Sequence, residues 1–462
     1  MLTYEVVLFS TRHLPGRAKP YMIRWRVGTE PFAKSYPNDT QANGRIAQLL
    51  NAIGKGEQFD TETGLPVSEL RLLKLKTTWY EHAKAYSAMK WPRASAKDRS
   101  ARADALATVT PALVTSRTAA PDPAVLRTAL SSWAFNHSPR QSEPPEPIAR
   151  ALAWITAKSL PVAALEDTEL VRAGLDALLL KLDGTPAAAN TATRKRNVFN
   201  NALSYAVQRR HLDVNPMQHV DWTPPETDDE VDFRYVPGPT QAAALIDAAP
   251  AQGPRGRHLA AFYACMYYAA MRPAEATDLR IADCKLPDSG WGELLLTGSS
   301  PSVSSRWTDD GSTHDERGLK RRARKATRDI PIPPELVTLL RTHIKENKPG
   351  PGGRVFSSAT GLPVTSNDYS RTWKELRTAA LTREQLADHY AEVPYSLRHA
   401  GVSFWLSSGV DPVEVARRAG HSVAVLYRFY AKILDGKREQ ANQKIDRALR
   451  DAQEAAEREL EP

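Results

Sequence analysis

The sequence predicts a multidomain, mainly α-helical protein that begins with a small β-rich unit and ends with a mixed unit, mostly helical but with a small antiparallel sheet. Its 462 residues would fill about three domains of ordinary size. Apolar and basic residues alternate over 21–27, as in a half-exposed strand, whereas apolar residues recur at helical spacing in later segments. A proline- and acid-rich stretch at 223–240 lacks either period and predicts a linker.

The β-rich unit is expected at 1–64, with strands at 4–9, 21–27 and 32–36 and a polar helix at about 40–55. Since strand residues alternate between faces, Arg24 and Arg26 would share one sheet face, with Lys34 nearby. That face is a candidate DNA contact, although a merely solvated basic face would have the same pattern.

Residues 65–222 are predicted to be helical, with proline-rich breaks at 120–123 and 138–147. The segment 191–207 carries an apolar stripe at helical spacing, and three basic residues lead its N-terminal end: Arg194, Lys195 and Arg196. A helix of this polarity can present its N-terminus and its cations to a backbone phosphate.

The largest unit is expected at 241–435, with helices on both sides of a short β-meander. A strand is predicted at 291–297 and a surface loop at 298–318. The charged tail at 436–462 has apolar residues at helical spacing, which favours a helix that docks on its own domain or on a neighbouring subunit.

Composition points to a polyanionic partner. The net charge of the chain is +9, and its basic residues are clustered along the sequence. Clusters concentrate positive electrostatic potential more than a uniformly basic surface would. Only two cysteines occur, Cys265 and Cys284, so neither a disulfide framework nor a cysteine metal cluster is expected, in keeping with a reducing cytoplasm. No apolar run approaches the roughly 20 residues of a membrane span, and no export signal is expected.

The chemistry-bearing residues follow one another near the C-terminal end. Arg398 precedes a predicted helix joint in which Asp411 begins a helix as its N-cap and Gly420 ends it as a left-handed cap. His421 then lies at a tight turn, 23 residues after Arg398, and Tyr430 follows nine residues later on the next helix.

This stretch resembles the active-site region of the tyrosine recombinase (lambda-integrase-like) family, whose pattern is His-x-x-Arg, Gly-His and a nucleophilic tyrosine. Upstream, 268–279 resembles the family's first arginine box, with Arg272 as the first catalytic arginine and Glu275 as the acid one turn later. The motifs cover about 255–435, and four boxes in the correct order are specific, although each one alone would be weak.

The resemblance implies a phage or plasmid integrase that cuts and rejoins DNA without metal, cofactor or ATP. Tyr430 would attack the scissile phosphate, Arg272 and Arg398 would hold it, and His421 would donate to a nonbridging oxygen or assist proton transfer. Glu275 would orient an arginine.

Two departures from the family pattern concern proton transfer. Tyr395 stands where the family usually has histidine, and its hydroxyl would serve as a supporting donor. Residues 318–333 resemble the β-hairpin that carries the family's general-acid lysine. Lys320 on the first strand is favoured over Lys325 near the turn, and the neighbouring Arg321 and Arg322 are candidate DNA contacts.

Other interpretations stay open. Tyr427, one turn before Tyr430, is expected to be a packing aromatic, and His399 a supporting or packing residue. A type IB topoisomerase-like or telomere-resolving enzyme would carry the same constellation, and a catalytically silent DNA-binding protein would keep the fold. A metal-dependent nuclease is disfavoured because no acid and histidine cluster has suitable spacing.

The resemblance also implies an organisation. Residues 1–64 would be an arm-type DNA-binding domain, 65–222 a helical core-binding (SAM-like) domain, 223–240 a linker, 241–435 the catalytic domain and 436–462 a tail helix. Four protomers would form a homotetramer on double-stranded DNA attachment sites. A directionality factor is a possible further partner, and the expected location is the nucleoid in the cytoplasm.

Overall fold

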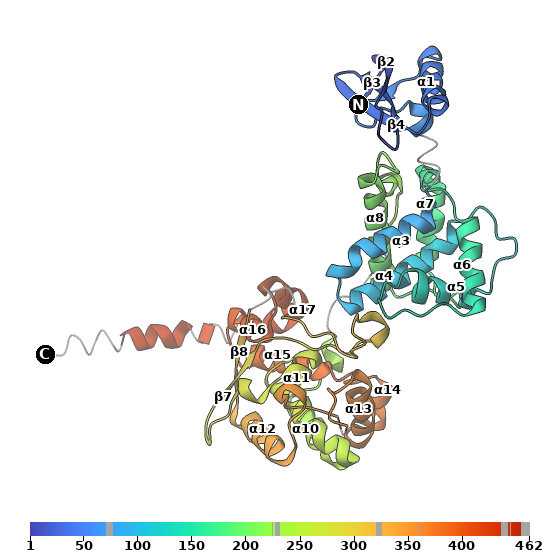
Figure 1. Cartoon of the computed structure of the whole chain (residues 1–462). Coiled ribbons are helices and arrows are strands. Elements are labelled where there is room, and N and C mark those ends of the chain that lie inside the picture. Colours follow the sequence, from blue (N-terminus) through green and yellow to red (C-terminus); the bar gives the residue numbers. More distant parts are fainter. Residues whose placement is uncertain are drawn as a thin grey trace. The chain divides into compact units, whose positions relative to one another are not determined.

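The computed structural model describes residues 1–70, 77–223, 225–226, 232–319, 326–358, 360–435, 442–443 and 445–453. It divides into two compact units, Met1–Thr227 and Asp228–Pro462 (Figure 1). Within the described residues, no helix is both long and apolar enough to cross a membrane.

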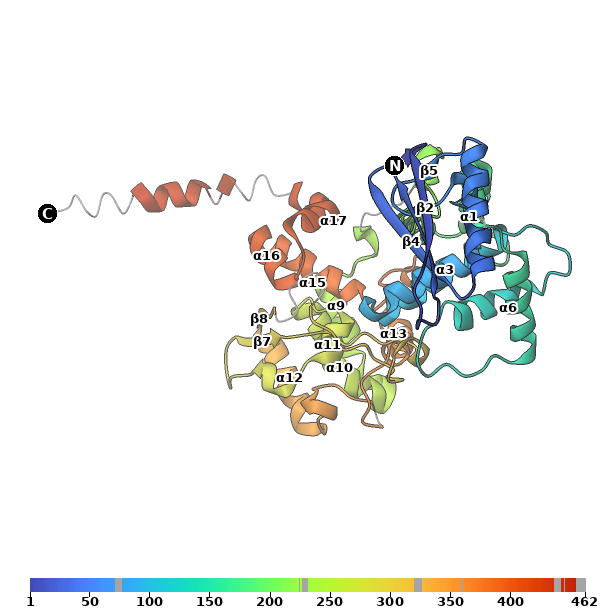
Figure 2. The same ribbon diagram turned by 45° about the horizontal axis from the view of Figure 1, so that its top comes forward.

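The first unit begins with a three-stranded antiparallel sheet of order β2-β3-β4, formed by Val6–His13, Tyr21–Val27 and Glu30–Tyr36. Helix α1 (Asp39–Gly54) lies along this sheet, as Figures 1 and 2 both show. A short pair of strands, β1 (Leu2–Thr3) and β5 (Phe59–Asp60), joins the ends of the segment. Apolar residues of β3, among them Ile23 and Trp25, are buried against α1, so the predicted three strands and helix are confirmed.

Helices make up the rest of the first unit. They are α3 (Trp79–Lys90), α4 (Ala96–Val109), α5 (Pro123–Ala129), α6 (Glu146–Lys158), α7 (Thr168–Leu178) and α8 (Ala189–Gln208). Helix α8, predicted at 191–207, packs against α4. The ring of Trp79 meets that of Phe199 edge-on at 5.3 Å, and its Nε1 donates to Thr110 Oγ1 at 3.0 Å. These contacts form the centre of the helical core.

The second unit has a helical core with a small antiparallel sheet of order β6-β7-β8, formed by Cys284–Lys285, Gly292–Leu296 and Arg328–Ile332. Its helices are α9 (Pro239–Asp247), α10 (Gly253–Tyr268), α11 (Pro273–Asp278), α12 (Pro334–Glu346), α13 (Ser366–Ala380), α14 (Arg383–Ala387), α15 (Ser396–Ser407), α16 (Pro412–Ala419) and α17 (Val423–Asp435). The mainly helical architecture and the strand predicted at 291–297 are confirmed.

Helix α10 is the centre of this unit and packs against α12, α13 and α15. Its contact with α15 is close because Gly401 has no side chain: a Cβ there would lie 2.0 Å from the carbonyl oxygen of Tyr267. This approach places the start of α15 beside the turn that joins α10 to α11.

The segment 298–318 is a loop, as predicted, but it is packed against the unit at several points. Ser300, Trp307 and His314 are buried. The backbone N–H of Ser300 donates to the carbonyl of Ala274 at 2.8 Å, and His314 Nε2 interacts with the carbonyl of Val364 at 3.2 Å. Within the segment, Ser312 Oγ donates to the carbonyl of His314 at 2.7 Å and accepts from its backbone N–H at 3.1 Å. The bond from Ser300 to Ala274 ties the segment to α11.

The tail is helical at 442–443 and 445–453, and the side chains of Ile445 and Leu449 are exposed. Its other residues lie outside the described residues. Docking of the tail therefore stays a prediction.

Candidate active site

Arg272 occupies the N-terminus of α11, directly after the turn from α10. Its backbone N–H and its Nη1 each donate to the carboxylate of Glu275 at 2.8 Å, and its Nη2 donates to the carbonyl of Gly420 at 3.1 Å. The side chain is 21% exposed. The guanidinium is thus oriented from two sides and still reaches solvent.

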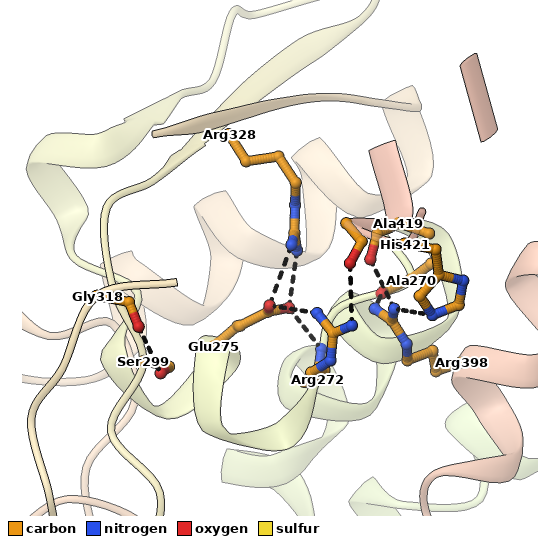
Figure 3. Close-up of polar contacts among 10 residues, drawn as sticks. Ala270, Arg272, Glu275, Ser299, Gly318, Arg328, Arg398, Ala419 and His421 are labelled. Carbon is orange, nitrogen blue, oxygen red and sulfur yellow. Dashed lines mark hydrogen bonds and ion pairs between the residues drawn. The ribbon is translucent and has the colours of Figure 1, made fainter. Parts of the chain in front are cut away.

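Glu275 is buried between two arginines (Figure 3). Opposite Arg272, both Nη atoms of Arg328 donate to its carboxylate, at 3.1 and 2.7 Å. Burial alone would raise the pKa of Glu275, but the charges of Arg328 and Arg272 outweigh it and lower the pKa to about 2. The carboxylate is therefore ionised and fixes both guanidinium groups.

Arg398 lies on the first turn of α15 and is fully buried. Its Nη1 donates to the carbonyl of Ala270, and its Nη2 donates to the carbonyl of Ala419 at 2.6 Å and to His421 Nε2 at 2.7 Å (Figure 3). One side chain thereby joins the α10–α11 turn to the end of α16. Burial lowers the pKa of Arg398, but arginine stays charged at neutral pH.

His421 follows the joint between α16 and α17. Asp411 Oδ1 caps α16 by accepting from the N–H of Val413 at 2.8 Å, and Gly420 ends it with φ 64°, so both predicted caps are confirmed. Burial, followed by the charges of Arg398 and Arg272, lowers the pKa of His421 to about 3. The ring is therefore neutral, and because Nε2 accepts from Arg398, the proton is assigned to Nδ1.

The Nδ1 of His421 is buried and has no hydrogen-bond partner among the described residues. A donor without a partner beside two guanidinium groups is suited to an oxyanion. The site thus offers three donors to a negatively charged group: Arg272, Arg398 and His421.

Tyr430 lies on α17 at a local break in the helix, with φ −127° and ψ 15°, and is 1% exposed. Its hydroxyl lies 2.8 Å from His399 Nδ1, and its ring centroid is 6.4 Å from that of His421. Burial raises the pKa of Tyr430 more than the charge of Arg398 lowers it. Tyr427, by contrast, is 50% exposed.

Tyr395 precedes α15 and contacts both arginines. Its phenol interacts with the guanidinium of Arg272, and the guanidinium carbon of Arg398 lies 5.9 Å from its ring centroid. Its ring also meets that of His399 edge-on at 5.1 Å. The structure therefore brings Arg272, Glu275, Tyr395, Arg398, His421 and Tyr430 together, as the sequence motifs predicted.

The predicted lysine cannot be placed in the same way. Lys320 and Lys325, together with Arg321 and Arg322, lie outside the described residues. Strand β8 begins after this segment, at Arg328, and delivers that arginine to Glu275.

The predicted DNA contacts in the sheet fall on two faces. Strand pairing places Arg24 between Phe9 and Ala33, and its guanidinium lies 5.7 Å from the Phe9 ring centroid. Lys34, however, pairs with the buried Ile23 and so lies on the other face, although its own side chain is exposed. The expectation that it accompanies Arg24 and Arg26 does not fit this register.

The three basic residues of α8, Arg194, Lys195 and Arg196, have different surroundings. Lys195 is buried, and its Nζ binds Asp104 at 3.1 Å and Thr108 at 2.9 Å, which does not fit a phosphate contact. The guanidinium carbon of Arg196 lies 5.0 Å from the ring centroid of Trp222. Arg194 is exposed and stays available to a phosphate.

Two residues of the site were not assigned to it from the sequence. Arg328 carried no motif signal, and His399 was interpreted as a supporting or packing residue. Both are recognised only by contacts made across the fold. Within the described residues, no group of three or more histidines, cysteines or acids could hold a metal ion.

Comparison with known proteins finds a match to one family model, described as the phage integrase family, over residues 238–436. No curated protein sequence matches the chain. Among solved structures, the Tn1549 transposon integrase in complex with transposon right end DNA is 17% identical, with a TM-score of 0.48 over 63% of this chain and 90% of that one.

Two other solved structures are similar at a lower level. XerH site-specific recombinase bound to its palindromic difH substrate is 13% identical, with a TM-score of 0.42 over 74% of this chain and 94% of that one. A lambda integrase dimer bound to a COC′ core site is 14% identical, with a TM-score of 0.39 over 62% and 91%. These similarities in shape are weak, whereas the family match rests on the sequence itself.

Proposed function

We propose that the chain belongs, through residues 238–436, to the phage integrase family of tyrosine recombinases, and that Tyr430 is the nucleophile with which it cuts and rejoins DNA at specific sites. The observation that carries this proposal is the convergence of Arg272, Arg398 and His421 around the joint that precedes Tyr430. Arg272 donates to the carbonyl of Gly420 and Arg398 to that of Ala419, so both arginines are linked to the joint.

The proposed reaction begins with attack of the Tyr430 hydroxyl oxygen on the scissile phosphorus. A covalent 3′-phosphotyrosine forms, and the bond to the 5′-oxygen breaks. Arg272 and Arg398 stabilise the charge that develops on the nonbridging oxygens, with His421 Nδ1–H as a further donor. Lys320 is proposed to protonate the leaving 5′-oxygen, and Tyr395 to support Arg272.

Ligation is the reverse of cleavage. The 5′-hydroxyl of a second strand attacks the phosphotyrosine and releases Tyr430. Since the phosphodiester energy is kept in the covalent intermediate, the reaction needs no ATP, and the arginines supply the charge for which other enzymes use a metal.

The partner is double-stranded DNA, since the net charge of +9 favours a polyanion. We assign residues 1–64 to arm-site binding, 65–222 to core-site binding and 241–435 to catalysis, with 223–240 as a linker and 436–462 as a tail that docks in the assembly. A homotetramer on two attachment sites, aided by a directionality factor, would integrate or excise a mobile element at the nucleoid in the cytoplasm.

The deciding experiment uses nicked suicide DNA cloned from the flank of the element, without added metal. Wild type should give a denaturation-resistant adduct, Tyr430→Phe should give none, and Tyr427→Phe should behave as wild type. An adduct that persists in Tyr430→Phe would refute the assigned nucleophile. DNA binding by wild type with no adduct on any flanking site would favour a silent DNA-binding protein.

A further inference from the structure

The hydroxyl of Tyr430 has a basic nitrogen beside it that the family motifs do not account for. Its oxygen lies 2.8 Å from His399 Nδ1, within normal hydrogen-bond distance. The two residues are 31 positions apart and lie on different helices, α15 and α17. In the neutral tautomer that carries its proton on Nε2, the imidazole accepts a hydrogen bond from the phenolic hydroxyl at Nδ1.

The other side chains around Tyr430 are poorly placed to take that proton. His421 Nε2 already accepts from Arg398 at 2.7 Å, and the ring centroids of His421 and Tyr430 are 6.4 Å apart. Arg272 and Arg398 have no acceptor atom. Tyr395 is itself a phenol and stands at the position where the family usually has a histidine.

We propose that His399 is the general base that takes the proton of Tyr430 during strand cleavage and returns it during ligation, an inference that rests on the proposed function. Tyr395 and His399 are four residues apart and their rings are in contact, so they lie on one face of the chain at the start of α15. His399 thus lies one helical turn after Tyr395, which occupies the position where the family usually has its histidine.

The surroundings of His399 keep it in the neutral form, which is the form that can accept a proton. Burial, followed by the charge of Arg398, lowers its pKa to about 4. Arg398 acts on it from the same helix, and the ring of Tyr395 meets it from the residue that precedes α15. His421 faces it from the α16–α17 joint and Tyr430 from α17. Arg272 interacts with Tyr395. Its conjugate acid, once formed, would readily give the proton back.

The proton balance of both steps follows. In cleavage, the proton of Tyr430 passes to His399 Nδ1 as the tyrosine oxygen bonds to phosphorus, and the 5′-oxygen leaves with the proton of the general acid, proposed as Lys320. In ligation, the tyrosine oxygen leaves phosphorus and takes its proton back from the His399 imidazolium, while the attacking 5′-hydroxyl returns a proton to the lysine.

The test compares His399→Asn, His399→Ala and wild type in single-turnover adduct formation on the nicked suicide DNA. The amide oxygen of asparagine can accept the Tyr430 hydrogen bond in place of Nδ1 but is no base, so Asn keeps the positioning and loses the proton transfer. Both variants should bind the DNA and form adduct about 100-fold more slowly, the usual scale of general-base catalysis. A wild-type rate in His399→Asn would overturn the proposal.

A second substrate distinguishes a base from an acid. A 5′-bridging phosphorothiolate releases a thiolate that needs no proton, so a defect in the general acid disappears on it. The defect of His399→Asn should persist on this DNA, because the tyrosine must still be deprotonated. Its disappearance would make His399 an acid and would refute the assignment.

The wild-type protein gives a measurement that does not depend on the folding of a variant. With His399 as base, the single-turnover rate should stay nearly constant between pH 6 and 9. If hydroxide removes the proton instead, the rate should rise about tenfold per pH unit, which would contradict the proposal. Failure of wild type to form any adduct would refute the proposed function itself, and thus differs from every outcome above.

Discussion

Arg328 and Glu275 form a bidentate ion pair in the interior of the second unit, with both side chains 2% exposed. Arg328 is the first residue of β8, and Glu275 lies on α11 three residues after Arg272. The pair therefore ties the strand that follows the predicted lysine segment to the helix that carries the first arginine. Because Glu275 binds both arginines, Arg328 helps to orient the guanidinium of Arg272 through this carboxylate.

Arg328→Lys should slow adduct formation by at least about tenfold while DNA binding is retained, because lysine keeps the charge but cannot bind Glu275 in two places. Arg341→Lys is the matched control, since Arg341 forms an ion pair with Asp288 that is exposed and its exchange should change nothing. Full activity of Arg328→Lys would mean that Arg272 is positioned without this pair.

Arg272→Ala should slow adduct formation by about 100-fold or more and leave most DNA binding intact. The side chain is partly exposed, and Glu275 keeps its pair with Arg328, so the fold should survive. Losing one preorganised donor to the phosphate costs about 100- to 1000-fold in comparable sites. Gel-shift and adduct assays on the same DNA would measure both effects, and cleavage at the wild-type rate would refute the role of Arg272.

Gly420→Ala should destabilise the protein and impair cleavage together. Gly420 has φ 64°, and a Cβ there would lie 2.0 Å from Arg328 Nη1, so the new methyl would push against the ion pair. Gly16→Ala is the control, because Gly16 has φ 84° but nothing within 4 Å of a Cβ. We expect about 1 kcal/mol for the backbone strain alone and clearly more at Gly420, measured by denaturant unfolding.

The site could be predicted largely from short-range patterns. The caps at Asp411 and Gly420 depend on neighbouring residues, and they place His421 and Tyr430 correctly along the chain. Arg328 and His399 depend instead on contacts across 53 and 31 residues. A spacing rule carries no information about such pairs, because they form only when β8, α11, α15 and α17 pack together.

The positions of the basic side chains also depend on the packed fold and not on the local sequence. Charge alone predicted Lys195 as a phosphate contact, but the structure turns it inward to Asp104, which lies on another helix. Alternation along β3 predicted the face of Arg24 and Arg26, whereas the face of Lys34 depends on its pairing with Ile23. Register and burial are properties of the packed fold.

Unfolding should become easier as the pH falls from about 6.5 to 4. His82 Nε2 donates to the carbonyl of Ala202 at 2.9 Å, and His343 Nε2 to that of Val355 at 3.1 Å. Burial lowers the pKa of each histidine to about 4, below the usual value of about 6.5. The unfolded chain therefore binds more protons in this window, so stability present above pH 6.5 is lost toward pH 4.

Thermal unfolding of the full chain at pH 7 and pH 5 measures this effect. His82→Gln keeps an amide donor without a titrating ring and should reduce the pH dependence of the melting temperature. Equal melting temperatures for wild type at both pH values would contradict the prediction.

Arg194 and Lys195 should respond to alanine in opposite ways although they are neighbours on α8. Lys195→Ala removes the partner of Asp104 and Thr108 within the helical core, so it should lower the free energy of unfolding by about 1–3 kcal/mol and leave the salt dependence of DNA binding unchanged. Arg194→Ala should leave stability unchanged and reduce the slope of log affinity against log salt by about one. Isothermal denaturation and binding titrations at several salt concentrations distinguish the two, and a reduced salt slope in Lys195→Ala alone would mean that the buried lysine turns outward on DNA.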